Sequence, residues 1–117
     1  NNLGSTLKKA GRYKEAEPLY QRALAGHETN LGPRHPLTLI SMTSLGGLLR
    51  KTGKRTDAEP LLRRALLGKE AAIGLAHQST LFSAYQLRIF LRDGGQYTEA
   101  EGLLRRAVQV GVLVSPS

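Results

Sequence analysis

The feature that most constrains the fold is a phrase that the chain repeats every 42 residues. AEPLYQRALAGHE at residues 16–28 returns as AEPLLRRALLGKE at residues 58–70, and a shorter copy, AEGLLRRAV, follows at residues 100–108. A fixed period of about 20–50 residues is typical of structural repeats that bury their apolar faces against one another. The sequence therefore predicts a stack of similar units within a single domain of 117 residues.

Each period divides into two helical segments joined by a short turn. Apolar residues recur every three or four positions through residues 37–51 and again through residues 55–71, as they do in amphipathic helices. Gly53, between them, suits the left-handed conformation that ends many helices. Pro60 lies near the start of the second segment, where a missing N–H costs least. The same plan predicts helices at residues 1–10, 13–29, 79–93 and 97–111, and no segment shows the alternation of a strand.

Small residues mark the places where the helices must approach closely. Gly46 and Ala58 fall where the two helices of a pair cross, and Ala65 falls where the second helix meets the next pair. A side chain larger than alanine is expected to overpack these contacts, at a cost of roughly 1–3 kcal/mol.

These residues resemble the tetratricopeptide repeat in its 42-residue, kinesin-light-chain-like form. GRYKEAEPLYQRAL at residues 11–24 and the loop LGPRHPLTL at residues 31–39 carry the kinesin-light-chain-like character, and the third copy departs from the pattern with Arg88 in place of a glycine. The resemblance implies an all-α, right-handed α-solenoid of antiparallel helix hairpins, with about two and a half repeats. The general repeat pattern is met in the second copy by Leu45, Gly46, Gly53, Ala58, Leu62 and Ala65.

We expect residues 1–117 to form one domain with repeat 1 at 1–30, repeat 2 at 36–72, repeat 3 at 78–112 and a tail at 113–117. Three repeats are the usual minimum for a stable stack, and its ends usually carry polar capping elements. Neither end looks capped, since the first helix begins mid-pattern and the tail is apolar before its final Ser-Pro-Ser. We therefore expect a part of a longer array. The alternative is a self-sufficient six-helix bundle with the tail folded back.

The three histidines do not form a pattern that predicts a metal or catalytic site. His35 and His77 occupy equivalent loops one repeat apart, so we expect both to order the loop before the next helix. His27 is expected at an exposed position, which Lys69 takes in the second copy. No cysteine is present, and no carboxylate stands beside these histidines at the spacing of metal ligands.

The glycine pairs and the carboxylate pairs do not predict a phosphate-binding or catalytic site either. Gly46-Gly47 and Gly94-Gly95 belong to no phosphate-binding motif that follows a strand. Acidic pairs recur with the period, whereas a general acid–base pair would be a single constellation. We expect no enzymatic activity, catalytic residue, metal site, cofactor or small-molecule substrate. A minor alternative is an enzyme, or a domain that regulates one in the same polypeptide.

Composition limits the partners. A formal net charge of +8 favours an acidic partner, whereas aromatic residues at 5% and the absence of Trp are poor support for a surface that stacks nucleic-acid bases. The N-terminus lacks the apolar core of a signal peptide, and no apolar run approaches the roughly 18 residues of a membrane span. A protein or peptide partner, a place in a multi-protein complex and, by default, a cytoplasmic location are expected.

The resemblance implies that the first helix of each pair lines a concave groove, which in this family holds extended peptides or a partner's helix. Basic residues, amides, hydroxyls and an aromatic–aliphatic patch there suit an acidic peptide with one large apolar anchor. The alternative is that the basic residues solvate helix ends, where cations favour the dipole. The candidate groove residues are Asn2, Ser5, Lys8, Lys9, Thr43, Ser44, Arg50, Lys51, Phe82, Tyr85, Gln86, Ile89 and Arg92, with Asn1, Ile40 and Gly47 beside them.

Most of the positive excess falls on the second helices and the loops between pairs, toward the convex side. Arg63 with Arg64, and Arg105 with Arg106, are the strongest pairs and form a candidate convex basic patch for a second protein, an anionic membrane surface or a nucleic acid. The main prediction is a non-enzymatic protein–protein interaction scaffold, adaptor or structural subunit of a larger assembly. The alternative is a nucleic-acid-binding helical repeat that uses its basic surface.

Overall fold

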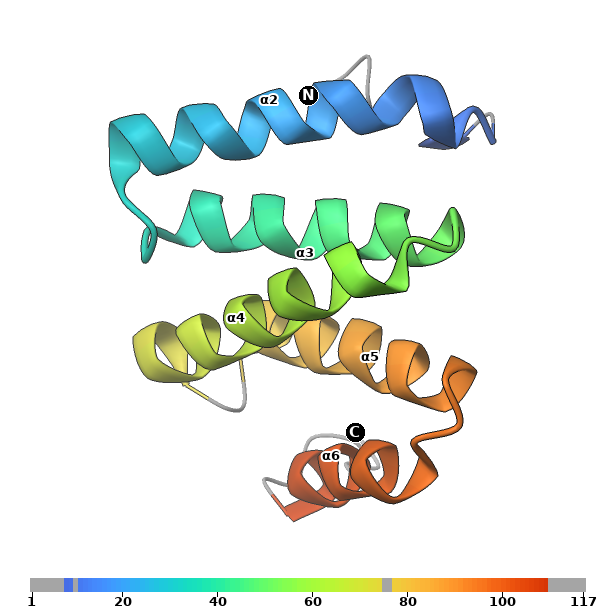
Figure 1. The fold of residues 1–117 in the computed structure, drawn as a ribbon. Coiled ribbons are helices and arrows are strands. Elements are labelled where there is room, and N and C mark those ends of the chain that lie inside the picture. The colour runs from blue at the N-terminus through green and yellow to red at the C-terminus, as the bar shows by residue number, and fades with distance from the viewer. Residues whose placement is uncertain (1–7, 10, 75–76, 110–117) are drawn as a thin grey trace.

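The computed structural model describes residues 8–9, 11–74 and 77–109, and most of these are helical. Within these ranges five helices follow one another, and no strand is present (Figure 1). The predicted all-α class is confirmed. The helix predicted at residues 1–10 lies outside the described residues, apart from Lys8 and Lys9, which are helical. The five are α2 (Tyr13–Leu31), α3 (Pro36–Lys51), α4 (Arg55–Ile73), α5 (Gln78–Asp93) and α6 (Tyr97–Gln109).

The helices form a stack in which each one packs mainly on its neighbours in the chain. α3 packs on α2 and α4, α5 packs on α4 and α6, and α3 also contacts α5 directly. Figure 1 shows the succession from α2 at one end to α6 at the other. Contacts this local along the chain are typical of an α-solenoid. Below, α3 and α5 are called the first helices, and α2, α4 and α6 the second helices.

The turns and loops end and begin the helices at the predicted places. Gly53 has a φ of +82°, and this left-handed turn lets the Lys54 N–H donate to the Leu49 carbonyl at 2.9 Å. His35 and His77 precede α3 and α5, and the Nδ1 of each accepts a hydrogen bond from the backbone N–H two residues on, at 3.1 and 3.0 Å. The prediction that both histidines order the loop before a first helix is confirmed.

Two prolines lie deeper in the second helices than the sequence suggested. Pro18 and Pro60 are each the sixth residue of a helix, past the first turn of α2 and α4. Because proline has no backbone N–H, each helix lacks one internal hydrogen bond there. Both prolines are exposed, so water can solvate that part of the backbone.

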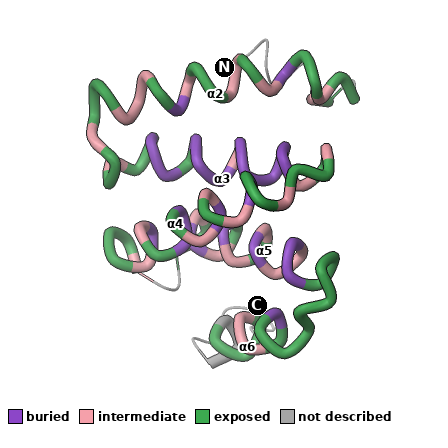
Figure 2. Tube along the Cα trace, viewed as in Figure 1, coloured by how far each residue is buried: buried purple, intermediate pink, exposed green. Residues whose placement is uncertain are grey.

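Small residues set the close crossing of α3 and α4, as predicted. A Cβ added at Gly46 would lie 2.7 Å from Leu62 Cδ2, and Ala58 and Ala65 are fully buried. Leu62 is also fully buried, so it has no room to give way. Figure 2 shows that buried residues concentrate on α3, the helix with neighbours on most sides, whereas α2 and α6 are largely exposed.

His27 is partly buried and Lys69 is buried, which corrects the expectation of an exposed position. His27 Nδ1 is 2.6 Å from Ser41 Oγ in a partly buried contact. Lys69 is only 3% exposed, and its Nζ donates to the Ser79 carbonyl at 3.1 Å. Burial lowers the pKa of Lys69 to about 8. The position is buried because this face of each second helix packs on the first helix that follows it.

Candidate partner-binding surface

The first helices approach each other through short groups. Thr43 Oγ1 on α3 lies 2.8 Å from Ser83 Oγ on α5, and the Thr43 hydroxyl also lies within 3.1 Å of the Leu39 carbonyl. One helical turn further along α3, Gly47 lies against the Gln86 side chain, whose Oε1 would be 3.0 Å from a Cβ at Gly47. Hydroxyls and a glycine therefore allow the two first helices to pack side by side.

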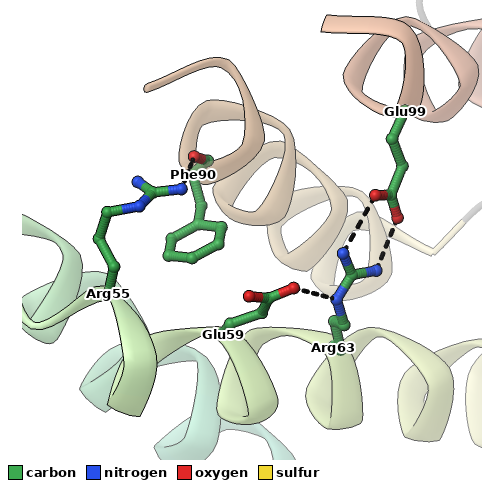
Figure 3. A network of polar contacts seen from close by, with 5 residues as sticks. All are labelled: Arg55, Glu59, Arg63, Phe90 and Glu99. Carbon is green, nitrogen blue, oxygen red and sulfur yellow. Dashed lines mark hydrogen bonds and ion pairs between the residues drawn. The ribbon is translucent and has the colours of Figure 1, made fainter. Parts of the chain in front are cut away.

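The second helices are connected by longer side chains. Arg63 on α4 reaches Glu99 on α6 with Nη–Oε distances of 2.6 and 3.0 Å, and it also pairs with Glu59 on its own helix (Figure 3). Arg64 reaches Glu28 on α2 at 3.7 Å. Short contacts between first helices and long ones between second helices agree with a stack that curves toward α3 and α5, as the resemblance implies. Below, the outward side of these two helices is called the concave surface, and its role as a groove stays a prediction.

Apolar side chains are exposed on this concave surface. Ile40 on α3, and Phe82 and Tyr85 on α5, are large hydrophobic residues left open to solvent. Beside them, Gln86 is partly buried, and its Oε1 atom is buried without a hydrogen-bond partner among the described residues. An exposed apolar row of this kind is what a polypeptide segment can bind to.

Thr43 was expected in the groove but is buried, so this expectation was wrong. It is 2% exposed and lies beneath α5, where its hydroxyl contacts Ser83. Tyr85 holds the equivalent position one repeat later and is exposed. The difference arises because, in the part of the chain that the structure describes, no first helix follows α5.

Several basic residues expected in the groove are engaged within the chain. Arg50 Nη1 pairs with Asp93 Oδ2 at 3.1 Å, and Lys51 Nζ lies 5.6 Å from the centre of the Tyr13 ring on α2. Lys8 is partly buried, and burial, together with the positive charges of Lys51 and Arg50, lowers its pKa. Lys8, Arg50 and Lys51 therefore lie near one another at one end of the first helices.

The remaining groove candidates differ in accessibility. Lys9 and Arg92 are exposed, and Ser44 and Ile89 are partly buried. Asn1, Asn2 and Ser5 lie outside the described residues. That the accessible members bind a partner stays a prediction.

The four arginines of the candidate convex basic patch are all paired with carboxylates, so they do not form a patch of unneutralised charge. Arg63 binds Glu59 and Glu99, and these hydrogen bonds raise its pKa above the ordinary value. The correction has a physical reason: acidic residues of adjacent second helices come within reach only in the folded stack. The other pairs are Arg64 with Glu28, Arg105 with Glu101 and Arg106 with Glu70.

Two further observations concern metal binding and membrane crossing. Among the described residues, no group of three or more His, Cys, Asp or Glu side chains is placed to hold a metal ion. No helix in the described ranges combines the length and apolarity that crossing a membrane requires.

Comparisons with known proteins agree with this architecture. Residues 1–71 match the family model described as the tetratricopeptide repeat. A similar solved structure holds nearly identical TPR-like repeats of a Podosopora anserina protein assigned as a kinesin light chain, with 26% sequence identity and a TM-score of 0.85. The match covers 93% of this chain and 52% of the solved chain, so the chain spans about half of that chain's length. None of the curated proteins matches at a significant level.

Proposed function

The chain belongs to the tetratricopeptide repeat family, and from this we propose that it is a non-enzymatic scaffold that binds an acidic segment of a partner protein along its concave surface. Tetratricopeptide repeats generally mediate protein–protein interactions, and proteins of this kind are typically non-enzymatic. Such a module can serve as an adaptor or as a structural subunit of a larger assembly.

The observation that carries the proposal is the exposed apolar row of Ile40, Phe82 and Tyr85 on the first helices. Aromatic and aliphatic anchors that become buried supply most of the affinity in protein interfaces. A single bulky side chain of the partner, placed between Ile40 and Phe82, would cover surface that is now open to water.

Electrostatics supports the acidic character of the partner. Burial lowers the pKa of Lys8, and the positive charges of Lys51 and Arg50, which lie nearby at one end of the first helices, lower it further. A carboxylate bound there would relieve this repulsion. Such charges contribute more to the association rate and orientation than to the final affinity.

The nucleic-acid alternative has less support. Binding to phosphates depends on available lysine and arginine side chains, and the two strongest arginine pairs of the second helices are engaged by carboxylates. A titration with single-stranded RNA at two salt concentrations would test it. Tight binding with a steep salt dependence would favour the alternative over the scaffold.

Backbone amide NMR tests the location of the binding surface. A short peptide with glutamates on both sides of a single phenylalanine is titrated into the labelled protein, and a matched peptide carries glutamines instead. We expect the acidic peptide to shift the amide signals of α3 and α5 around Ser44, Phe82 and Gln86 more than those of α4 around Leu67. Equal shifts with the glutamine peptide would contradict the acidic preference, and shifts confined to the second helices would contradict the surface.

A further inference from the structure

Asp93 is an acidic residue at a position where the other two repeats carry lysine. The equivalent residues one and two repeats earlier are Lys51 and Lys9. Asp93 is the last residue of α5. A carboxylate is unfavourable at the negative, C-terminal end of a helix dipole, whereas a lysine suits that end. The stability of α5 alone therefore does not account for an aspartate at this position.

The Asp93 carboxylate binds Arg50, one of the basic residues at the end of the first helices. Arg50 Nη1 donates to Asp93 Oδ2 at 3.1 Å. Among the residues that the structure describes, this is the one ion pair that joins α3 to α5, since the other pairs between helices involve the second helices. Arg50 also lies near Lys8, whose pKa is lowered by burial and by the charges of Lys51 and Arg50. Asp93 thus neutralises one charge of the basic group to which a partner's carboxylate is proposed to bind.

The geometry of this pair allows one carboxylate to be exchanged for another. The pair has a single hydrogen bond, whereas Arg63 holds Glu99 through two. The Asp93 side chain is 51% exposed, so water can replace Arg50 at its carboxylate, and a partly exposed pair of this kind contributes little to stability. The Arg50 side chain is only 16% exposed. A second carboxylate therefore reaches Arg50 chiefly by taking the place of Asp93.

We propose that Asp93 competes with the partner's carboxylate for Arg50 and is thereby a specificity-determining residue of the concave surface. A segment that supplies a carboxylate in place of Asp93 gains the interaction with Arg50, and a neutral segment gains nothing there. The internal competitor lowers the affinity for acidic segments as a whole. The inference rests on the proposed binding of an acidic segment to the concave surface.

The affinity of Asp93→Asn for a peptide tests the competition. The probe is the phenylalanine peptide flanked by glutamates, its matched control is the peptide with glutamines, and binding is measured by fluorescence anisotropy. We expect Asp93→Asn to bind the glutamate peptide about twofold to fivefold more tightly than wild type, the size expected of one partly exposed charge pair. Its affinity for the glutamine peptide should equal that of wild type.

Two control variants and one spectroscopic signal separate competition at Arg50 from a change in net charge. Glu28→Gln removes a carboxylate that pairs with Arg64 near the C-terminal end of α2, and it should give little gain. In the Arg50→Gln background, the gain from Asp93→Asn should fall to the level of Glu28→Gln. The carboxyl carbon NMR signal of Asp93, assigned by its loss in Asp93→Asn, should shift when wild type binds the glutamate peptide and should shift less with the glutamine peptide.

Equal affinities of wild type and Asp93→Asn for the glutamate peptide would overturn the inference and leave the proposed concave surface intact. A gain as large in Glu28→Gln, or as large without Arg50, would also overturn it, because net charge alone would then explain the effect. The same holds if the peptide binds without shifting the Asp93 signal. Absence of binding by both wild type and Asp93→Asn, with helical content unchanged by circular dichroism, would overturn the inference together with the proposed function.

Discussion

Arg63 on α4 holds both carboxylate oxygens of Glu99 on α6, although the two residues are 36 positions apart in the chain (Figure 3). The same separation joins Glu70 to Arg106 and Glu28 to Arg64. Each of these pairs connects one second helix to the next. The outer side of the stack is thus held by ion pairs, and the inner side by the close contact of Thr43 with Ser83.

Removing the Arg63–Glu99 pair should cost little stability at neutral pH. Both side chains are partly exposed, so a double-mutant cycle with Arg63→Gln and Glu99→Gln is expected to give a coupling of about 0.5–1 kcal/mol that shrinks at high salt. Urea unfolding measures it. A coupling of zero at low salt would show that the pair does not help to hold the second helices together.

The same pair predicts a pH dependence. The hydrogen bonds from Arg63 lower the pKa of the Glu99 carboxyl. A carboxyl with a depressed pKa in the folded state adds stability above its unfolded pKa, and this contribution is lost as the pH falls through the folded value. Wild type should therefore lose more stability than Glu99→Gln on acidification. Parallel losses in the two proteins would contradict the pairing.

Buried Lys69 should make the protein more stable at alkaline pH. Burial lowers its pKa from 10.5 to about 8, so between these values the unfolded chain binds more protons than the folded one, and stability rises with pH. Lys69→Met should raise the free energy of unfolding at neutral pH by about 1–3 kcal/mol, allowing for the lost hydrogen bond to Ser79, and should flatten the rise.

The control for this experiment is Lys14→Met, at an exposed position on α2. It should leave the rise in stability between pH 8 and 10.5 in place. The free energy of unfolding is measured with urea across that pH range. If it rose as much in Lys69→Met as in wild type, the burial of Lys69 would be contradicted.

A matched pair of glycine substitutions tests the helix crossing. Gly46→Ala places a methyl group 2.7 Å from Leu62 Cδ2, so it should destabilise the fold by about 1–2 kcal/mol despite the better helix propensity of alanine. Gly26→Ala on α2 meets nothing within 4 Å and should stabilise by about 0.5–1 kcal/mol. Thermal unfolding compares them. A gain of similar size in both variants would mean that the crossing at Gly46 is looser than described.

The repeat made the helices predictable from the sequence. The observed bounds of α2 through α5 lie within about two residues of those expected, because each period carries the same turn glycine and the same capping histidine or its equivalent. The role of Gly46 followed from its position opposite Ala58, and Leu62 confirmed it. These features depend on local spacing, which a sequence displays directly.

The site was less predictable because it depends on how one repeat packs on the next. Thr43 and Tyr85 are equivalent in the sequence, yet α5 covers one and leaves the other open. The acids from other helices that pair with Arg63 and Arg64 are 36 positions away, a separation that the 42-residue period does not reveal. Burial of Lys69 was missed because a lysine is seldom buried; here α5 covers it, and its Nζ donates to the Ser79 carbonyl.

The affinity of the acidic phenylalanine peptide for Phe82→Ser, measured by fluorescence anisotropy beside wild type and Leu67→Ser, tests the central claim most directly. Phe82 and Leu67 are both exposed hydrophobic residues, one on the concave surface and one on the second helix α4. The proposed concave surface predicts that Phe82→Ser weakens binding by about tenfold while Leu67→Ser binds like wild type. Binding unchanged in Phe82→Ser, or weakened as much in Leu67→Ser, would contradict it.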